Sequence, residues 1–260
     1  AAEAPGADAR LEVSGLTRAF GGVLAVSEVS LSLGAGEVVG IIGPNGAGKT
    51  TLVSLIAGTV RAGQGRVELA GRDITRLSPA GRCRRGLGRS YQQTAVFGPA
   101  TVAENLERAR LFGGARTGRE ELAQLAALVG LADRTEEVAG QLPYGLQKML
   151  GLVMAFACNP EVLLLDEPAA GLEAGERTRV DALVEVARDR GCSVLLVEHD
   201  MELVRRLCSR LVVLDSGRVL AQGETQRVLA EPAVITAYLG SAEHAEMPDP
   251  ARPESMVRDG

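Results

Sequence analysis

The sequence predicts an α/β fold with a mostly parallel sheet, and three observations support that prediction. Short, continuously apolar runs, typical of strands that are covered on both faces, alternate with stretches of helical periodicity. A glycine-rich motif at 43–50 lies between one such run and one such helical stretch. Hydrophobic residues make up 46% of the 260 residues and charged residues 23%, values that allow a sizeable buried core.

The expected elements alternate along the chain. Apolar β-rich runs predict strands at Val29–Leu33, Val38–Ile42, Val67–Leu69, Val162–Leu165, Val194–Val197 and Leu211–Leu214. Helical spacing predicts helices at Lys49–Ala57, Glu120–Val129, Gln147–Cys158, Glu176–Arg190 and Met201–Leu207. Because strands and helices alternate, most strands are expected to run parallel. The polar segments 1–9 and 241–260 lack periodicity and are expected to be tails.

Composition excludes several classes of protein. A net charge of −5, 3% aromatic residues and no tryptophan argue against a nucleic-acid binder that relies on positive charge or base stacking. Two histidines are too few for a multi-histidine metal site. The four cysteines form no CxxC pair, so they are expected to be small buried residues in a reducing setting. No apolar run is long enough to span a bilayer.

The motif Gly43-Pro44-Asn45-Gly46-Ala47-Gly48-Lys49-Thr50 matches the phosphate-loop pattern G-x-x-x-x-G-K-[ST]. A predicted strand precedes it, and a helix continues from Thr51. Glycines let backbone N–H groups turn inward around phosphate oxygens, and the helix N-terminus adds a partial positive charge. Lys49 is expected to reach the outer phosphates, and the Thr50 hydroxyl to bind Mg²⁺. Only two of the 28 basic residues are lysines, and one stands here.

Polar residues also follow two predicted strands. Asp166 and Glu167 come directly after an apolar run, at the strand end where α/β sheets bind ligands. Asp166 is expected to hold Mg²⁺, and Glu167 to orient and polarise an attacking water. His199 follows the next predicted strand and is expected to contact a terminal phosphate. The alternatives are that the two acids are only solvated at the strand end and that the histidine is structural. The phosphate loop in the same chain favours the functional interpretation.

Together these pieces resemble the ATP-binding-cassette (ABC) ATPases from about residue 11 to 240. The segment Leu142-Pro143-Tyr144-Gly145-Leu146-Gln147 looks like the signature sequence of that family. The resemblance implies a P-loop NTPase core of the ABC ATPase type, with an antiparallel β subdomain and a helical subdomain. It implies one nucleotide-binding domain at 10–240, with the helical subdomain at about 93–157.

A finer resemblance is to the ATP-binding subunit of branched-chain (hydrophobic) amino acid importers. It rests on four segments, Ala19–Val26, Asp166–Leu172, Glu198–Met201 and Ala237–Gly240. It implies an ATP-hydrolysing subunit that energises transport through separate membrane subunits, with a second ATPase subunit and an extracytoplasmic solute-binding protein. The expected place is the cytoplasmic face of the inner membrane, and no nucleic acid is involved.

The resemblance also implies roles for individual residues. Phe20 would stack on adenine, and Gln92 would join Mg²⁺ and sense the membrane partner. ATP and Mg²⁺ are the implied ligands, with Lys49, Glu167 and His199 catalytic and with Thr50, Gln92 and Asp166 at the metal. The signature residues would lie at a helix N-terminus and face the phosphate loop of the second subunit, and these residues are Pro143, Tyr144, Gly145, Leu146 and Gln147.

Pro143 departs from the family pattern, which has serine at this position. Proline offers neither a hydroxyl nor an N–H group, so the usual side-chain bond to the γ-phosphate cannot form. We therefore expect the partner ATPase subunit to bring the more active signature. The stretch between Gln92 and Pro143 is also shorter than is usual in the subgroup, which predicts a trimmed helical region.

Other functions remain as alternatives. An ATPase of a urea or other small-solute importer would share much of the same pattern. A soluble cassette for DNA repair or translation is disfavoured, because a long coiled-coil insertion and a second cassette are both missing. A GTP switch is disfavoured because neither lysine follows an asparagine. A nucleotide-gated binding module without turnover stays open.

Two weaker patterns carry expectations of their own. The arginines at 82, 84, 85 and 89 form a basic cluster, which is expected to be a solvated face, or else a contact for an acidic partner loop or lipid head groups. The apolar stripe of Leu122, Leu125, Ala126 and Val129 is expected to be helix-packing core.

Overall fold

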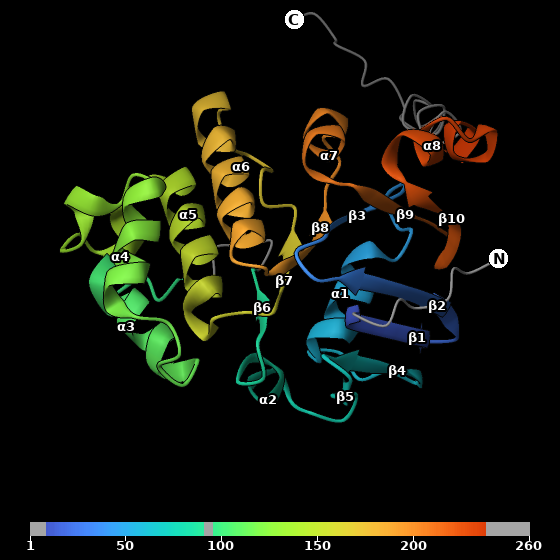
Figure 1. Cartoon of the computed structure of the whole chain (residues 1–260), viewed down its shortest axis with the longest axis horizontal. Coiled ribbons are helices and arrows are strands. Elements are labelled where there is room, and N and C mark those ends of the chain that lie inside the picture. The colour runs from blue at the N-terminus through green and yellow to red at the C-terminus, as the bar shows by residue number, and fades with distance from the viewer. Residues whose placement is uncertain (1–8, 91–95, 238–260) are drawn as a thin grey trace, which may run out of the picture.

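The computed structural model describes residues 9–90 and 96–237 (Figure 1). Gln92, the segment 238–240 and the predicted tails, apart from Ala9, lie outside the described residues. Three of the predicted elements have the predicted bounds, namely β3 (Val38–Ile42), α1 (Lys49–Ala57) and α7 (Met201–Leu207). The other described strands are β1 (Ala9–Phe20), β2 (Val23–Gly34), β4 (Gln64–Leu69), β5 (Arg72–Asp73), β6 (Leu87–Arg89), β7 (Val162–Asp166), β8 (Ser193–Val197), β9 (Arg210–Asp215) and β10 (Arg218–Glu224). The other described helices are α2 (Pro79–Cys83), α3 (Val102–Phe112), α4 (Arg119–Leu128), α5 (Tyr144–Ala155), α6 (Ala174–Asp189) and α8 (Thr225–Leu229), with short 3₁₀ turns η1 (Ala132–Arg134), η2 (Ala139–Gln141) and η3 (Phe156–Cys158).

The central layer is a six-stranded sheet in the order β10-β9-β3-β8-β7-β6. β3 pairs parallel with β8 and β9, and β7 pairs parallel with β8 and β6; β10 alone among these pairs antiparallel, with β9. The mostly parallel sheet that the sequence predicts is therefore confirmed. Asp166 at the end of β7 lies opposite Val197 at the end of β8, and Ile41 near the end of β3 lies opposite the same residue. The carboxyl ends of these three strands consequently meet at one edge of the sheet.

A second sheet of four antiparallel strands, in the order β2-β1-β4-β5, lies at the lower right in Figure 1. β1 was not among the predicted strands, because only one of its faces is buried and its apolar residues alternate with polar ones. Leu11, Val13 and Leu16 are almost fully buried and pack in a cluster with residues of α1 and β3. This sheet confirms the antiparallel subdomain that the family resemblance implies.

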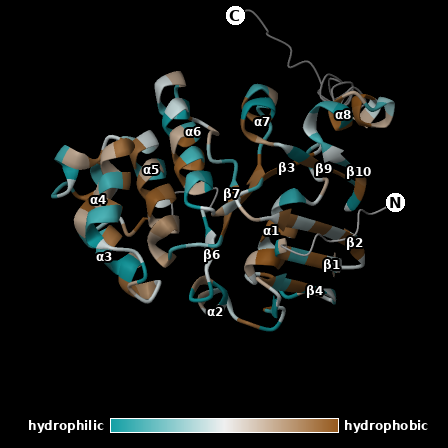
Figure 2. Ribbon diagram, viewed as in Figure 1, coloured by the Kyte–Doolittle hydropathy of each residue, from teal (hydrophilic) through white to brown (hydrophobic). Residues whose placement is uncertain are grey.

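The helices α3, α4 and α5 form a layer at the left in Figure 1. The predicted stripe on α4 is core, since Leu122, Leu125, Ala126 and Val129 are all at most 3% exposed. α3 was not among the predicted helices, and a capping box between Thr101 and Glu104 begins it. Figure 2 shows the apolar residues gathered on the strands and on α5, with polar residues on the outer surfaces of the helices. Within the described ranges, no helix has the length and apolarity needed to cross a bilayer.

The arginine cluster corrects one expectation. Arg82 is 4% exposed. Its guanidinium donates hydrogen bonds to backbone carbonyl oxygens of α1 and of the segment before α2, those of Leu55, Ile56, Thr75 and Leu77. The Arg89 side chain is only 11% exposed and pairs with Asp166. A solvated face is thus wrong for these two residues, because carbonyl and carboxylate oxygens replace the water. Arg84 and Arg85 are exposed, as expected.

Candidate nucleotide-binding site

The loop between β3 and α1 has a backbone that glycine alone can adopt at two points. Gly43 and Gly48 have φ values of 149° and 97°. A Cβ atom on Gly43 would lie 2.1 Å from the carbonyl oxygen of Leu214, and one on Gly48 would lie 2.3 Å from that of Ala25. Strand β9 on one side and strand β2 on the other therefore fix the shape of the loop.

Lys49 is folded back over this loop. Its Nζ donates hydrogen bonds to the carbonyl oxygens of Gly43 (2.7 Å) and Pro44 (2.9 Å), and the residue is 6% exposed. Burial lowers the pKa of Lys49, while the negative charges of Glu167 and Asp166 oppose that shift. The structure thus brings the lysine of the phosphate loop into the electrostatic field of both acids at the end of β7.

Asp166 presents a buried carboxylate that lacks hydrogen bonds from the described part of the chain. The residue is 1% exposed, and neither Oδ1 nor Oδ2 accepts a hydrogen bond there. It forms an ion pair with Arg89, with 3.8 Å between Nη2 of Arg89 and Oδ2 of Asp166. Burial raises the pKa of Asp166, and the Arg89 charge acts in the opposite direction. A buried carboxylate that accepts no hydrogen bond from the described residues is a suitable oxygen ligand for a hard divalent cation, so Asp166 fits Mg²⁺.

Glu167 has a left-handed backbone with φ of 49°, and it turns the chain at the end of β7. Its N–H group donates to the carbonyl oxygen of Val197 at 2.9 Å. Its Oε1 lies 3.0 Å from Nε2 of His199, which follows β8. The two side chains predicted from separate strand ends therefore face each other, as general acid–base work on a bound water requires.

Two residues without a predicted role hold this acid in place. Lys148 on α5 is 4% exposed, and its Nζ donates to the carbonyl oxygens of Glu167 (2.7 Å) and Ala170 (2.6 Å). Glu198 is 3% exposed, and its Oε1 accepts a hydrogen bond from the N–H of Ala169 at 2.9 Å. Burial raises the pKa of Glu198, opposed by backbone N–H donors and by Lys148. The signals in the sequence were the rarity of lysine and an acid directly after an apolar strand.

Phe20 ends β1 and remains 46% exposed, with the Arg18 guanidinium 4.9 Å from its ring centroid. β1 pairs with β2, and β2 supplies the carbonyl that contacts Gly48. This hairpin therefore places an exposed aromatic ring on the same sheet that borders the phosphate loop. Thr50 and Thr51 lie in the first turn of α1, and Thr50 is exposed.

The signature-like segment lies in another part of the molecule. Pro143 is the N-cap of α5 and makes no side-chain capping bond, while Tyr144 is 51% exposed. Leu146 is buried, and the Gln147 amide turns back to the carbonyl oxygen of Leu142 at 2.8 Å. A Cβ on Gly145 would overlap the Glu176 carboxylate. In Figure 1, α5 is separated from α1 by α6 and β7, so the two segments do not meet within one chain.

Comparison with known proteins places this geometry in a family. The model of the ABC transporter family matches residues 26–170. The LivG protein of Salmonella typhimurium, a high-affinity branched-chain amino acid transport ATP-binding protein, is 38% identical over 250 residues, which cover 89% of this chain and 98% of the relative. The chain belongs to the ABC transporter family. BraF of Pseudomonas aeruginosa, also a high-affinity branched-chain amino acid transport ATP-binding protein, is 38% identical, with the same coverage of both chains.

Solved structures agree with this assignment to the ABC family. The ADP conformation of MJ1267, an ATP-binding cassette of an ABC transporter, superposes with a TM-score of 0.79 at 29% identity and covers 89% of this chain and 99% of that one. A nucleotide-free cassette from an ABC transporter gives a TM-score of 0.78 at 28% identity, covering 88% and 98%. The predicted ABC ATPase fold and the ATPase class are thereby confirmed.

Proposed function

We propose that this ABC ATPase binds MgATP at 43–50 and is the ATP-hydrolysing subunit of an importer for branched-chain amino acids. The support for the substrate class is that LivG and BraF, whose names state branched-chain amino acid transport, align with this chain over 98% of their own length. A methionine import ATP-binding protein of Caulobacter vibrioides is also 38% identical, but the alignment covers 68% of it. The four sequence segments shared with the branched-chain subgroup support the same choice.

One observation carries the catalytic part of this proposal. The Asp166 carboxylate, which accepts no hydrogen bond from the described residues, and the carboxylate of Glu167, which pairs with His199, both interact electrostatically with Lys49. A buried lysine, a buried acid without hydrogen bonds and a paired acid next to it would be a costly arrangement in an unliganded structural role. A bound triphosphate with its metal ion would satisfy all three groups.

Each residue then has one task. Lys49 and the loop N–H groups bind the outer phosphates, and Phe20 stacks on the base. Thr50, Gln92 and Asp166 would hold Mg²⁺, which when bound neutralises charge on the phosphate oxygens. Glu167 orients the attacking water and accepts its proton, and His199 fixes the position of the Glu167 carboxylate. Lys148 and Glu198 hold the 167–170 backbone in place.

The signature segment would act on the site of a second ATPase subunit. The cassette MJ0796, at 25% identity and a TM-score of 0.72, has been solved as a dimer in a post-hydrolysis state with ADP and phosphate. In such a pair the first-turn N–H groups of α5 would face the partner's γ-phosphate, and Pro143 would add no side-chain donor. We place the pair against membrane subunits at the cytoplasmic face of the inner membrane, with an extracytoplasmic solute-binding protein delivering the solute.

The test is reconstitution of this chain with the membrane and ATPase subunits that copurify with it, in vesicles that also hold the solute-binding protein. We expect Mg²⁺-dependent phosphate release that rises at least threefold with leucine, isoleucine or valine, and no rise with methionine or inorganic phosphate. A rise with methionine or phosphate alone would refute the substrate class. A chain that binds ATP without any phosphate release in the complex would refute the hydrolytic role and leave the binding-module alternative.

A further inference from the structure

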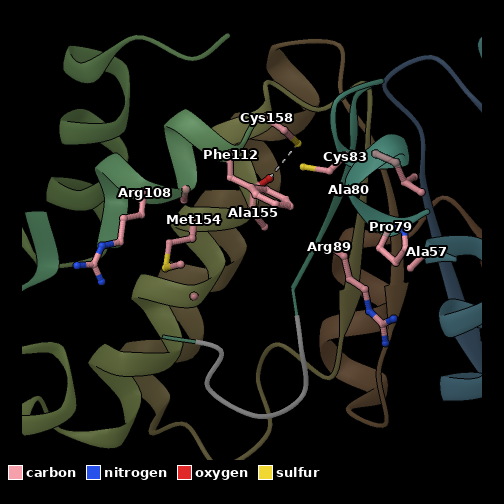
Figure 3. A pocket seen from close by; sticks show the side chains of 13 residues that line it. Ala57, Pro79, Ala80, Cys83, Arg89, Arg108, Phe112, Met154, Ala155 and Cys158 are labelled. Carbon is pink, nitrogen blue, oxygen red and sulfur yellow. Dashed lines mark hydrogen bonds between the residues drawn. The ribbon is translucent and has the colours of Figure 1, made fainter. Parts of the chain in front are cut away.

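A cavity of about 420 Å³ lies between α2 and the helical layer, and Leu87 and Arg89 of β6 and Ala57 at the end of α1 also line it (Figure 3). One wall comes from α2 and includes Pro79, Ala80 and Cys83. The other wall comes from α3, α5 and η3, and includes Phe112, Met154 and Cys158. Two of the four cysteines of the chain therefore line one space, although they are far apart in the sequence.

The two thiols point toward one another in Figure 3, and the Cys158 thiol donates a hydrogen bond to the carbonyl oxygen of Ala155 at 3.7 Å. Backbone contacts fix this approach. The N–H groups of Glu161 and Val162 donate to the carbonyl oxygen of Gly86 at 2.8 and 3.1 Å, and the N–H of Gly86 donates to that of Cys83 at 2.9 Å. The segment that follows α2 is thus tied to the segment that follows η3, which keeps the two elements that carry Cys83 and Cys158 side by side.

The environments of these two thiols differ in a way that suits stepwise oxidation. Cys83 is partly exposed, whereas Cys158 is 3% exposed. The adjacent Cys158 side chain, together with the charges of Arg84 and Arg116, lowers the pKa of Cys83 to about 7. The adjacent Cys83 side chain and burial both raise the pKa of Cys158. A large share of Cys83 is therefore thiolate at pH 7.5, whereas Cys158 remains a protonated thiol beside it.

The other two cysteines provide a contrast inside the same molecule. Cys192 and Cys208 are each 5% exposed, and burial raises the pKa of both to about 12. Neither lines the cavity. A thiol that is buried and protonated reacts slowly with oxidants, so these two serve as internal controls.

We propose that Cys83 and Cys158 form an oxidant-sensitive dithiol, a modification site on the cavity wall that a small hydroperoxide converts into an intramolecular disulfide. The Cys83 thiolate attacks the peroxide O–O bond, so that a sulfenic acid forms on Cys83 and an alcohol, or water from hydrogen peroxide, leaves with a proton. The Cys158 sulfur then attacks the Cys83 sulfur. The S–S bond forms, the hydroxyl leaves with the Cys158 proton as water, and the peroxide has accepted two electrons from the two thiols.

The new bond would join α2 to η3, the turn that continues the signature-bearing helix α5. It closes a loop that runs from Cys83 through the whole helical layer to Cys158. The site does not depend on ATP binding or on the transported solute, so its test and the tests of the proposed function can fail separately.

The experiment uses the full chain, reduced and then exposed to hydrogen peroxide at pH 7.5. Free thiols are alkylated, and the protein is digested without reduction by a protease other than trypsin, because Arg82 and Arg84 flank Cys83. We expect two of the four thiols to disappear, one linked peptide pair that contains Cys83 and Cys158, and full return of the thiols with dithiothreitol. Four thiols that survive, or a disulfide that maps to Cys192 or Cys208 or between two chains, would overturn the proposal.

Serine variants assign the order of the two steps. In Cys158→Ser, Cys83 should stop at the sulfenic acid and be trapped by dimedone. In Cys83→Ser, Cys158 should be lost at least tenfold more slowly than in the native chain, while Cys192→Ser should leave the native rate unchanged. Equal loss of Cys158 with and without Cys83 would contradict the assignment of Cys83 as the reacting thiolate. The native chain's peptide map decides the pairing even where a variant folds poorly.

Discussion

The two lysines of the chain occupy comparable positions in two different regions. Lys49 in the phosphate loop and Lys148 on the signature helix are both almost fully buried, and each donates two hydrogen bonds to backbone carbonyls of a loop that follows a strand. Burial lowers the pKa of both. Lys49 contacts carbonyls five and six residues away, whereas Lys148 contacts carbonyls 19 and 22 residues away.

This difference in sequence separation distinguishes Lys49, which we propose binds the ligand, from Lys148, which positions another residue. Lys49 holds its own loop and can exchange carbonyl oxygens for the phosphate oxygens of a ligand. Lys148 holds the backbone on which Glu167 stands, and Tyr144 at the start of the same helix packs near Gly171 in the loop that follows. A displacement of α5 would therefore move Lys148 and, with it, the backbone of Glu167, the residue that we propose orients the attacking water.

The largest effect is expected from Lys49→Ala. Loss of the ammonium removes a charge-assisted contact to the outer phosphates, which should lower ATP affinity about 100-fold, or about 2.7 kcal/mol. Hydrolysis should fall about 1000-fold, because the same contact stabilises the transition state. Nucleotide titration by fluorescence or calorimetry measures the first, and phosphate release measures the second. An unchanged ATP titration would remove the loop from its assigned role.

Lys148→Met should give a smaller loss of activity, and this loss should be in kcat rather than in ATP affinity. The variant keeps the volume but leaves the carbonyls of Glu167 and Ala170 without their donor, so kcat should fall about tenfold while KM stays within about threefold. ATP affinity should match that of the native chain, in contrast to Lys49→Ala. Lys148→Arg, which can donate to both carbonyls, should recover part of kcat. A loss of ATP affinity equal to that of Lys49→Ala would erase the distinction between the two regions.

Asp166→Asn should stabilise the protein without nucleotide. Burial raises the folded pKa of Asp166, so its ionisation opposes folding at neutral pH and no longer does so below the unfolded value near 3.8. Asparagine cannot ionise, so the melting temperature at pH 7.5 should rise by about 3 °C, the shift that 1 kcal/mol gives in a domain of this size. The gain should shrink as the pH is lowered toward 3.8. A variant that is less stable than the native chain at pH 7.5 would show that Arg89 outweighs burial.

Much of the core could be predicted because local sequence determines it. The strand β3, the loop at 43–50 and the helix α1 form one continuous stretch whose apolar run, glycines and helical spacing each have a local cause. The strand-end positions of Asp166, Glu167 and His199 were predicted for the same reason. The approach of Asp166 and Glu167 to Lys49 follows from the parallel order of β3, β8 and β7.

The parts that were missed depend on distant partners. β1 is buried on one face only, so its continuity is decided by β2 and β4 on either side. The burial of Arg82 depends on carbonyls of α1, which lie 26 and 27 residues away. The hydrogen bond from Lys148 to the carbonyl oxygen of Glu167 depends on how α5 packs against the sheet. The sequence holds only weak signals for them, such as the alternating apolar residues of β1 and the rarity of lysine, and these do not identify the distant partners.

The most direct test of the account concerns Glu167, since the account requires ATP held at 43–50 to be hydrolysed by the acid at the end of β7. In Glu167→Gln, ATP affinity should stay within about threefold of the native value, while single-turnover phosphate release should fall about 1000-fold. Glu185→Gln, on the exposed side of α6, is the matched control and should leave both quantities unchanged. Phosphate release at the native rate from Glu167→Gln, with ATP bound, would contradict the account.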